Sequence, residues 1–190
     1  MTLFWENGFD ATSMNDVAVA TGMAKPGLYE CFGDKNALYA KALKLYFKEY
    51  GEPGLQCIRA SNQPVSTALR QYLENVAAGA GDPECPSGCF IVNSIIGSAQ
   101  SDSEIKDLIR DIINQRLDVL IEYLSVAKEK GELTAETDPE ALALYFAGQE
   151  AAIAVLAREG AEPEKLGKFI DIAMKTLPQV SAEELAAGQG

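Results

Sequence analysis

The sequence predicts an all-α protein in which a small N-terminal unit of three helices precedes a larger helical domain. Three observations support this fold class. Apolar residues make up 47% of the 190 residues, which is enough for a buried core. These apolar residues recur at helical spacings, and no hairpin dipeptide lies between alternating apolar runs. Glycine and proline occur where helices would begin or end.

The first 50 residues carry the clearest helix signals. An N-cap followed by an acid three positions later forms a capping box, glycine ends a helix, and proline fits a first turn. The expected helices are 13–20, 26–32 and 35–50, and the residues that cap or break them are Thr12 or Ser13, Asp16, Gly22, Pro26, Gly33 and Asp34.

The motif "GEPG" at 51–54 is the expected domain boundary, because glycine and proline interrupt helices. It divides the chain into a domain of residues 1–50, a domain of residues 51–178 and a tail of residues 179–190. The second domain is expected to contain five helices, close to 64–78, 89–100, 101–130, 139–160 and 163–177.

The net charge of −12 argues against a protein that coats nucleic acid non-specifically. Residues 1–50 hold five Lys or Arg against six Asp or Glu, so almost all of the excess acid belongs to residues 51–190. The start "MTLFWENGFD" lacks the features of a signal peptide, and the apolar runs are too short to cross a bilayer. We therefore expect a cytoplasmic protein with reduced thiols and no membrane partner.

The stretch "ATSMNDVAVATGMAKPGLYECFGDK" reads as a helix, a glycine-containing turn at 21–24 and a second short helix. This is the helix-turn-helix arrangement, in which the second helix enters the major groove of DNA. Alone the pattern is a weak signal, because many helical proteins contain such a corner.

The longer stretch "GFDATSMNDVAVATGMAKPGLYECFGDKNALYAKAL" resembles the DNA-binding domain of the TetR/AcrR family over residues 3–47. The matching features are an aromatic residue after glycine, the "VA..TG" turn, "LY..F" in the second helix and "KNAL" in the next. The resemblance implies a ligand-responsive transcriptional regulator, a repressor that a small molecule releases from operator DNA. The first helix of that family begins well upstream, so here we expect a truncated first helix.

Six residues are candidates for contact with double-stranded DNA. Hydroxyls and free N–H groups at a helix start can bind phosphate, a lysine there adds charge, and a glycine permits close approach. The resemblance implies base-edge and phosphate contacts for two residues of the second helix, Lys25 and Tyr29. The complete set is Thr12, Ser13, Lys25, Gly27, Tyr29 and Lys35.

The central helices offer polar and aromatic residues among aliphatic ones, which suggests a small, fairly apolar effector. The candidate effector residues are Tyr72, Cys89, Phe90, Asn93, Tyr123, Phe146 and Gln149.

Cys85 and Cys89 flank "PSG" before a helix, whose N-terminus would lower a thiol pKa. A redox- or electrophile-responsive regulator is therefore the second hypothesis, and disulfide formation or soft-metal binding by this pair also stays open. The third hypothesis is a helical binding protein without DNA affinity. The chain contains no histidine and no phosphate-binding glycine loop, so we expect no enzyme activity, cofactor or metal.

The last two expected helices each carry an apolar stripe. Reading a palindromic operator requires two recognition helices, so two chains must associate, and the resemblance implies a four-helix bundle in this region. We therefore expect a homodimer whose interface contains Leu142, Phe146, Ile153, Leu156, Phe169 and Ile170.

Overall fold

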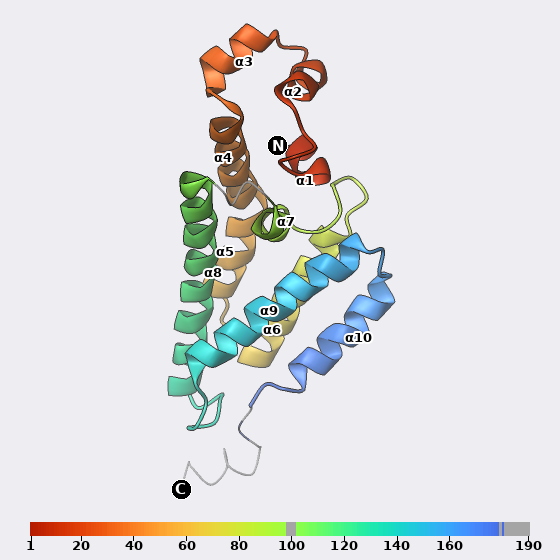
Figure 1. The fold of residues 1–190 in the computed structure, drawn as a ribbon. Helices are drawn as coiled ribbons and strands as arrows, with labels where there is room; N and C mark the ends of the chain where they lie inside the picture. Colours follow the sequence, from red (N-terminus) through yellow and green to blue (C-terminus); the bar gives the residue numbers. More distant parts are fainter. Residues whose placement is uncertain (98–101, 179, 181–190) are drawn as a thin grey trace, which may run out of the picture.

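The computed structural model describes residues 1–97, 102–178 and 180. Within these residues the chain is helical and forms no β-strand, which confirms the all-α prediction. Figure 1 shows an elongated molecule in which α2 and α3 lie at one end and the long helices α8 and α9 lie at the other.

We call the first four helices the head, and they follow the predicted caps. Ser13 and Asp16 form the capping box at the start of α2, and Gly22 ends that helix with a φ of 69°. Asp34 caps α4 by accepting a hydrogen bond from the backbone of Ala37. The head helices are α1 (Thr2–Asn7), α2 (Met14–Thr21), α3 (Lys25–Phe32) and α4 (Lys35–Tyr46).

The helix predicted to end near residue 50 does not end there. After α4 the chain makes a π-helical turn, η1 (Phe47–Gly51), and runs directly into α5 (Glu52–Arg59). Pro53 lies where the π-helical turn joins α5, in a helical segment that continues without a break. A Cβ at Gly51 would lie 2.5 Å from the Phe47 ring, so glycine here permits a tight turn and does not end a helix. The domain boundary itself stays a prediction.

We call α5 to α10 the body. Its helix α9 crosses α6 and packs against α8, and α10 lies beside α6 and α9 (Figure 1). The helix expected at 89–100 is shorter, and its last predicted residues, 98–100, lie outside the described residues. The remaining body helices are α6 (Val65–Ala80), α7 (Phe90–Ile96), α8 (Ser103–Glu129), α9 (Pro139–Arg158) and α10 (Pro163–Met174).

One of the hydrophobic cores joins the head to the body. Trp5 of α1 and Tyr46 of α4 lie edge to face, with ring centroids 4.8 Å apart. Phe90 of α7 makes the same kind of contact with Tyr46 at 5.7 Å and with Tyr39 at 5.4 Å. Ile109 of α8 is buried in the same cluster. The head therefore shares its core with α7 and α8.

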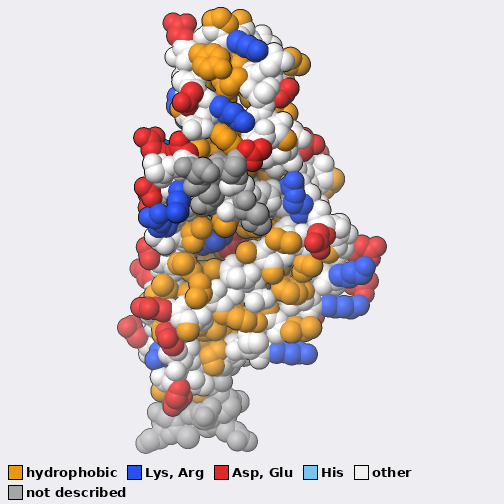
Figure 2. Space-filling model, viewed as in Figure 1, with side chains coloured by type: hydrophobic (Ala, Val, Ile, Leu, Met, Phe, Trp, Pro, Cys, Tyr) orange, Lys and Arg blue, Asp and Glu red, His pale blue; other side chains and the backbone are white. Residues whose placement is uncertain are grey.

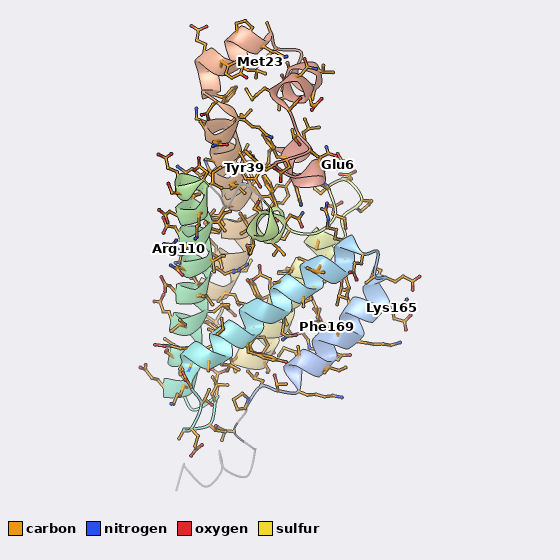
Figure 3. All side chains as sticks on the ribbon, viewed as in Figure 1. Glu6, Met23, Tyr39, Arg110, Lys165 and Phe169 are labelled. Carbon is orange, nitrogen blue, oxygen red and sulfur yellow. The ribbon has the colours of Figure 1, made fainter. Side chains whose placement is uncertain are left out.

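Three sets of polar contacts cross the same junction. The Tyr39 hydroxyl donates to Ser94 Oγ over 2.6 Å, because Ser94 Oγ already donates to the Phe90 carbonyl. Asn36 donates to Asp102 over 2.7 Å. Arg158, at the end of α9, donates to the carbonyl oxygens of Glu6 over 3.0 Å and of Ser87 over 3.1 Å. Figure 3 labels Tyr39 and Glu6 on the head side of this junction.

In the loop before α7, Gly88 lies too close to α9 to accept a side chain without a steric clash. Gly88 has a φ of 87°, and a Cβ there would lie 3.1 Å from the Ala154 carbonyl oxygen and 3.2 Å from Arg158 Cβ. Gly160 has the same φ of 87° but nothing within 4 Å of the added Cβ. Both alanine variants are destabilised by a left-handed backbone conformation at the substituted residue. Only Gly88→Ala also has to displace the Ala154 carbonyl group. We expect Gly88→Ala to lose about 1 kcal/mol more unfolding free energy than Gly160→Ala in urea denaturation. An equal loss of unfolding free energy in the two variants would show that the loop moves aside without destabilising the protein.

Candidate nucleic-acid interface and effector cavity

The exposed surface of α3 carries three of the predicted DNA contacts. Lys25 is exposed, and Tyr29, one helical turn later, leaves half of its side chain accessible. A Cβ built on Gly27 would meet nothing, so the surface is open between them. Figure 1 shows α3 at the tip of the molecule, away from the body helices.

The structure contradicts the prediction for Thr12. Its side chain is 1% exposed, and its hydroxyl donates to the Gly8 carbonyl over 2.8 Å. The threonine therefore fixes the corner between α1 and α2, and its hydroxyl is not available to phosphate.

Ser13 is exposed, but its polar groups are already engaged. Its hydroxyl and its backbone N–H both donate to Asp16, over 2.6 and 2.8 Å. These two hydrogen bonds hold the pKa of Asp16 below its usual value. A charged carboxylate therefore occupies the helix start where phosphate binding was predicted.

Lys35 is held by an aromatic ring. Its Nζ lies 4.1 Å from the ring centroid of Phe9, a cation–π contact between α4 and the segment after α1. The contact limits the freedom of this charge, and its role toward phosphate stays a prediction.

A cavity of about 320 Å³ lies between head and body. The head side is aromatic and includes Trp5 and Tyr46, while η1 adds Phe47 and Tyr50. The opposite side belongs to α6, α8 and α9, and Cys89 lies at the edge of α7. The lining also includes Gly51, Pro53, Gly54, Leu55, Cys57, Tyr72, Asn75, Val76, Gly79, Ala80, Gly88, Ile91, Ile112, Arg116, Glu150 and Ala154.

A charged pair lies on the body side of the cavity. Arg116 Nη1 donates to one Glu150 oxygen over 2.7 Å, and the Tyr72 hydroxyl donates to the other over 2.5 Å. Both charged side chains are only 13% exposed. Burial opposes the charge of Arg116, but the attraction of Glu150, its hydrogen bond, and the nearby Tyr72 and Cys89 together outweigh burial and raise the arginine pKa. Burial, and then the nearby Glu150 carboxylate, raises the pKa of Tyr72.

Two of the seven predicted effector residues, Tyr72 and Cys89, line the cavity. Phe90 and Phe146 are fully buried, each in one of two hydrophobic cores. Their place in an apolar helical pattern reflects packing in the core and not contact with an effector. The Tyr123 hydroxyl instead donates to the Gln63 carbonyl over 3.3 Å. The other two predicted residues, which are also absent from the lining, are Asn93 and Gln149.

The sequence-based list omitted the charged pair, although a signal was present. Arg116 lies one turn from Ile112 on α8, and Glu150 lies one turn from Phe146 on α9. A buried charged side chain requires a partner of opposite charge. A positive and a negative residue, each within an apolar stripe, could therefore have been predicted to form an ion pair. The aromatic wall from α1 could not be predicted, because it depends on how head and body pack.

The thiols do not match the predicted thiolate sensor. Cys89 does begin α7, but burial raises the pKa of its thiol, because desolvation outweighs the hydrogen bonds with Tyr46 and the Val92 backbone that lower it. Cys85 is half-buried, with its sulfur 3.7 Å from the Tyr50 hydroxyl. Among the described residues, no three Cys, His, Asp or Glu side chains gather as a metal site would require.

The predicted dimer stripe faces the interior of the chain. Phe146, Ile153 and Ile170 are core residues, because this stripe packs against the chain's own helices. The other three predicted residues, Leu142, Leu156 and Phe169, are partly buried against the same cores.

A different apolar face of α9 and α10 is exposed. It contains Leu144 at 64% exposure, Val155 at 42% and Ile172 at 65%. Figure 2 shows hydrophobic side chains spread over this side of the body. By length and composition alone α9 could also cross a membrane, although helices of soluble proteins pass the same test.

Two family models match the chain. The model described as "Bacterial regulatory proteins, tetR family" matches residues 1–42. The model described as "Tetracyclin repressor-like, C-terminal domain" matches residues 66–173, more than half of the chain. The chain belongs to the TetR family. TetR-family proteins are DNA-binding transcriptional regulators, so the family and the class of function predicted from the sequence are confirmed.

Two TetR-family relatives span nearly all of the chain. The HTH-type transcriptional repressor ComR of Escherichia coli K12 is 26% identical over 95% of this chain and 86% of its own. The uncharacterized HTH-type regulator YezE of Bacillus subtilis is 28% identical, over 92% and 90%.

Solved TetR structures share the fold. A cysteine mutant of CifR complexed with operator DNA has a TM-score of 0.85 at 23% identity, covering 93% of this chain and 92% of its own. AibR, in complex with isovaleryl coenzyme A and operator DNA, has a TM-score of 0.71 at 20% identity and covers 94% of both chains.

The cysteine environments predict an order of alkylation. Cys31 and Cys57 are exposed, whereas the raised pKa and partial burial of Cys89 leave little accessible thiolate. With iodoacetamide at pH 8, we expect Cys89 to react at least about tenfold more slowly than Cys31, because the thiolate is the nucleophile. Peptide mass spectrometry measures both rates, and urea provides the control in which the difference disappears. Fast native labelling of Cys89 would restore the thiol-sensor hypothesis.

Proposed function

We propose that this TetR-family protein is a cytoplasmic repressor that a small molecule releases from its operator. The observation that carries the proposal is the position of the cavity, whose walls come from both the head and the body. A molecule bound there contacts the DNA-binding helices and the body at once. If the molecule binds more tightly to one position of the head relative to the body than to another, its binding raises the population of the first position.

Operator binding is assigned to the exposed face of α3. Lys25 supplies a charge for phosphate or a guanine edge, and Tyr29 offers both a hydroxyl and an aromatic face. CifR and AibR, which share the fold, were solved with operator DNA, which supports this assignment by analogy. The alternative of a helical binding protein without DNA affinity predicts that substitutions on this face have no effect.

The effector is a small, mostly apolar molecule. A cavity of about 320 Å³ lies at the lower end of the range for small-molecule sites, and aromatic rings form much of its wall. The fold neighbour AibR was solved in complex with isovaleryl coenzyme A and operator DNA, so in that protein the same fold binds an organic molecule.

We assign the dimer interface to the exposed face of α9 and α10. Leu144, Val155 and Ile172 would be covered by the same face of a second copy. Exposed apolar side chains of this size on two adjacent helices are typical of an interaction surface. A dimer also places two α3 helices on one palindromic operator, whose half-sites are separated by roughly 34–36 Å.

Substitution of Lys25 tests the DNA interface. Lys25→Ala should weaken binding to duplex DNA from the region upstream of its own gene by about tenfold, because one direct contact is lost. The matched control is Lys165→Ala, which removes the same charge from α10, far from α3 (Figure 3). Fluorescence anisotropy at two salt concentrations measures both variants. If the two variants bind DNA equally well, α3 is not the contact helix.

Substitution of Leu144 tests the dimer. Leu144→Asp should turn the dimer into monomers and abolish operator binding while helix content is retained, because Leu144 is exposed in the single chain. Val126→Asp changes a side chain on α8 that is also exposed, and it should leave the dimer intact. Sedimentation velocity at micromolar concentration distinguishes the two states. A parent protein that sediments as a monomer contradicts the assignment.

A further inference from the structure

Two buried N–H groups beside the cavity have no acceptor. Trp5 Nε1 and Arg116 Nε are enclosed and make no hydrogen bond within the part of the chain that the structure describes. Both side chains line the same cavity, one from α1 and the other from α8. A buried donor without an acceptor is destabilising, and such groups are uncommon in folded proteins. Two of them at one cavity indicate a missing acceptor.

The carboxylate beside them is already occupied. Both oxygens of Glu150 accept hydrogen bonds, one from Arg116 and one from Tyr72. The Tyr50 hydroxyl is paired with the sulfur of Cys85. The buried polar atoms of this lining that lack a partner among the described residues are therefore both donors, Trp5 Nε1 and Arg116 Nε.

The charges of the cavity cancel. Arg116 and Glu150 are paired at 2.7 Å, and they are the charged side chains in the lining. An anionic guest would place a second negative charge beside Glu150, and a cationic guest would compete with Arg116. In an aromatic enclosure an unbalanced charge is costly, so the site favours a neutral guest.

We propose that the effector is a neutral, mostly apolar molecule with a hydrogen-bond acceptor oxygen of the ketone kind. This oxygen accepts hydrogen bonds from Trp5 Nε1 in the head and from Arg116 Nε in the body. Each side chain turns this donor toward the cavity when the effector binds. The aromatic wall covers the apolar part of the molecule. This inference rests on the proposed function, because it names the class of effector for the same cavity.

The arrangement explains how an effector would act on the head. Trp5 belongs to α1, and its ring also packs on Tyr46 of α4. A hydrogen bond from Trp5 to a guest that Arg116 also holds makes the position of α1 dependent on occupancy. The effector thereby contacts the DNA-binding unit directly.

Isothermal titration calorimetry of the full chain without DNA tests the class of effector. The probes are the ketones indanone, tetralone and acetonaphthone, the hydrocarbon tetralin and the carboxylate of tetralin. We expect at least one ketone to bind at least about tenfold more tightly than tetralin and than the carboxylate, because hydrogen bonds to charged groups are strong. Equal affinity for tetralone and tetralin, tighter binding of the carboxylate, or no ketone binding at all overturns the proposal.

A variant of the only tryptophan tests the donor. Trp5→Phe keeps an aromatic ring and removes the N–H, so the preference for ketone over tetralin should fall by at least about threefold. The affinity for tetralin reports any change of cavity shape. Tyr123→Phe, which removes a hydroxyl outside the cavity, is the control and should keep the preference. A preference that survives in Trp5→Phe contradicts the role of Trp5.

These titrations contain no DNA, so their outcome is independent of repression. A protein that prefers ketones but binds no operator retains this inference and refutes the proposed function. A protein that binds operator but shows no preference for ketones refutes this inference and leaves the proposed function in place.

Discussion

The aromatic contact between the head and α7 is the interaction on which the rest of the structure depends. Phe90 lies edge to face with both Tyr39 and Tyr46, and Trp5 packs on Tyr46 from α1. A head of four short helices buries too little surface to be stable alone, so it completes its core with α7 and α8. The cavity lies at this junction, and filling it therefore acts on the same residues that hold the head in place.

The pair of Arg116 and Glu150 is the second constraint. Two charges that are 13% exposed contribute little net stability, but the loss of one would leave the other buried without a partner. Tyr72 and Arg116 each donate to one oxygen of Glu150, while Trp5 Nε1 and Arg116 Nε make no hydrogen bond among the described residues.

Local features were predictable from the sequence, and features that depend on packing were not. The capping box at Ser13 and the stop at Gly22 depend on a few neighbouring residues, and both were predicted correctly. The helix end predicted near residue 50 was wrong, because the chain continues through a π-helical turn at Gly51 into α5. Phe146 satisfied the pattern for effector contact and for the dimer stripe, yet it belongs to the core. Apolar periodicity shows that a side chain is covered, and it does not show what covers it.

Operator affinity of a cavity-filled variant tests the central claim most directly, and it requires no effector. Gly54 lines the cavity, and a Cβ there would lie 3.8 Å from the Tyr72 ring, which is ordinary contact. Gly54→Ala should therefore bind operator like the parent, whereas Gly54→Leu, which occupies the cavity, should bind at least about tenfold more weakly with unchanged helix content. If Gly54→Leu is folded and binds operator as tightly as Gly54→Ala, the cavity does not control the head.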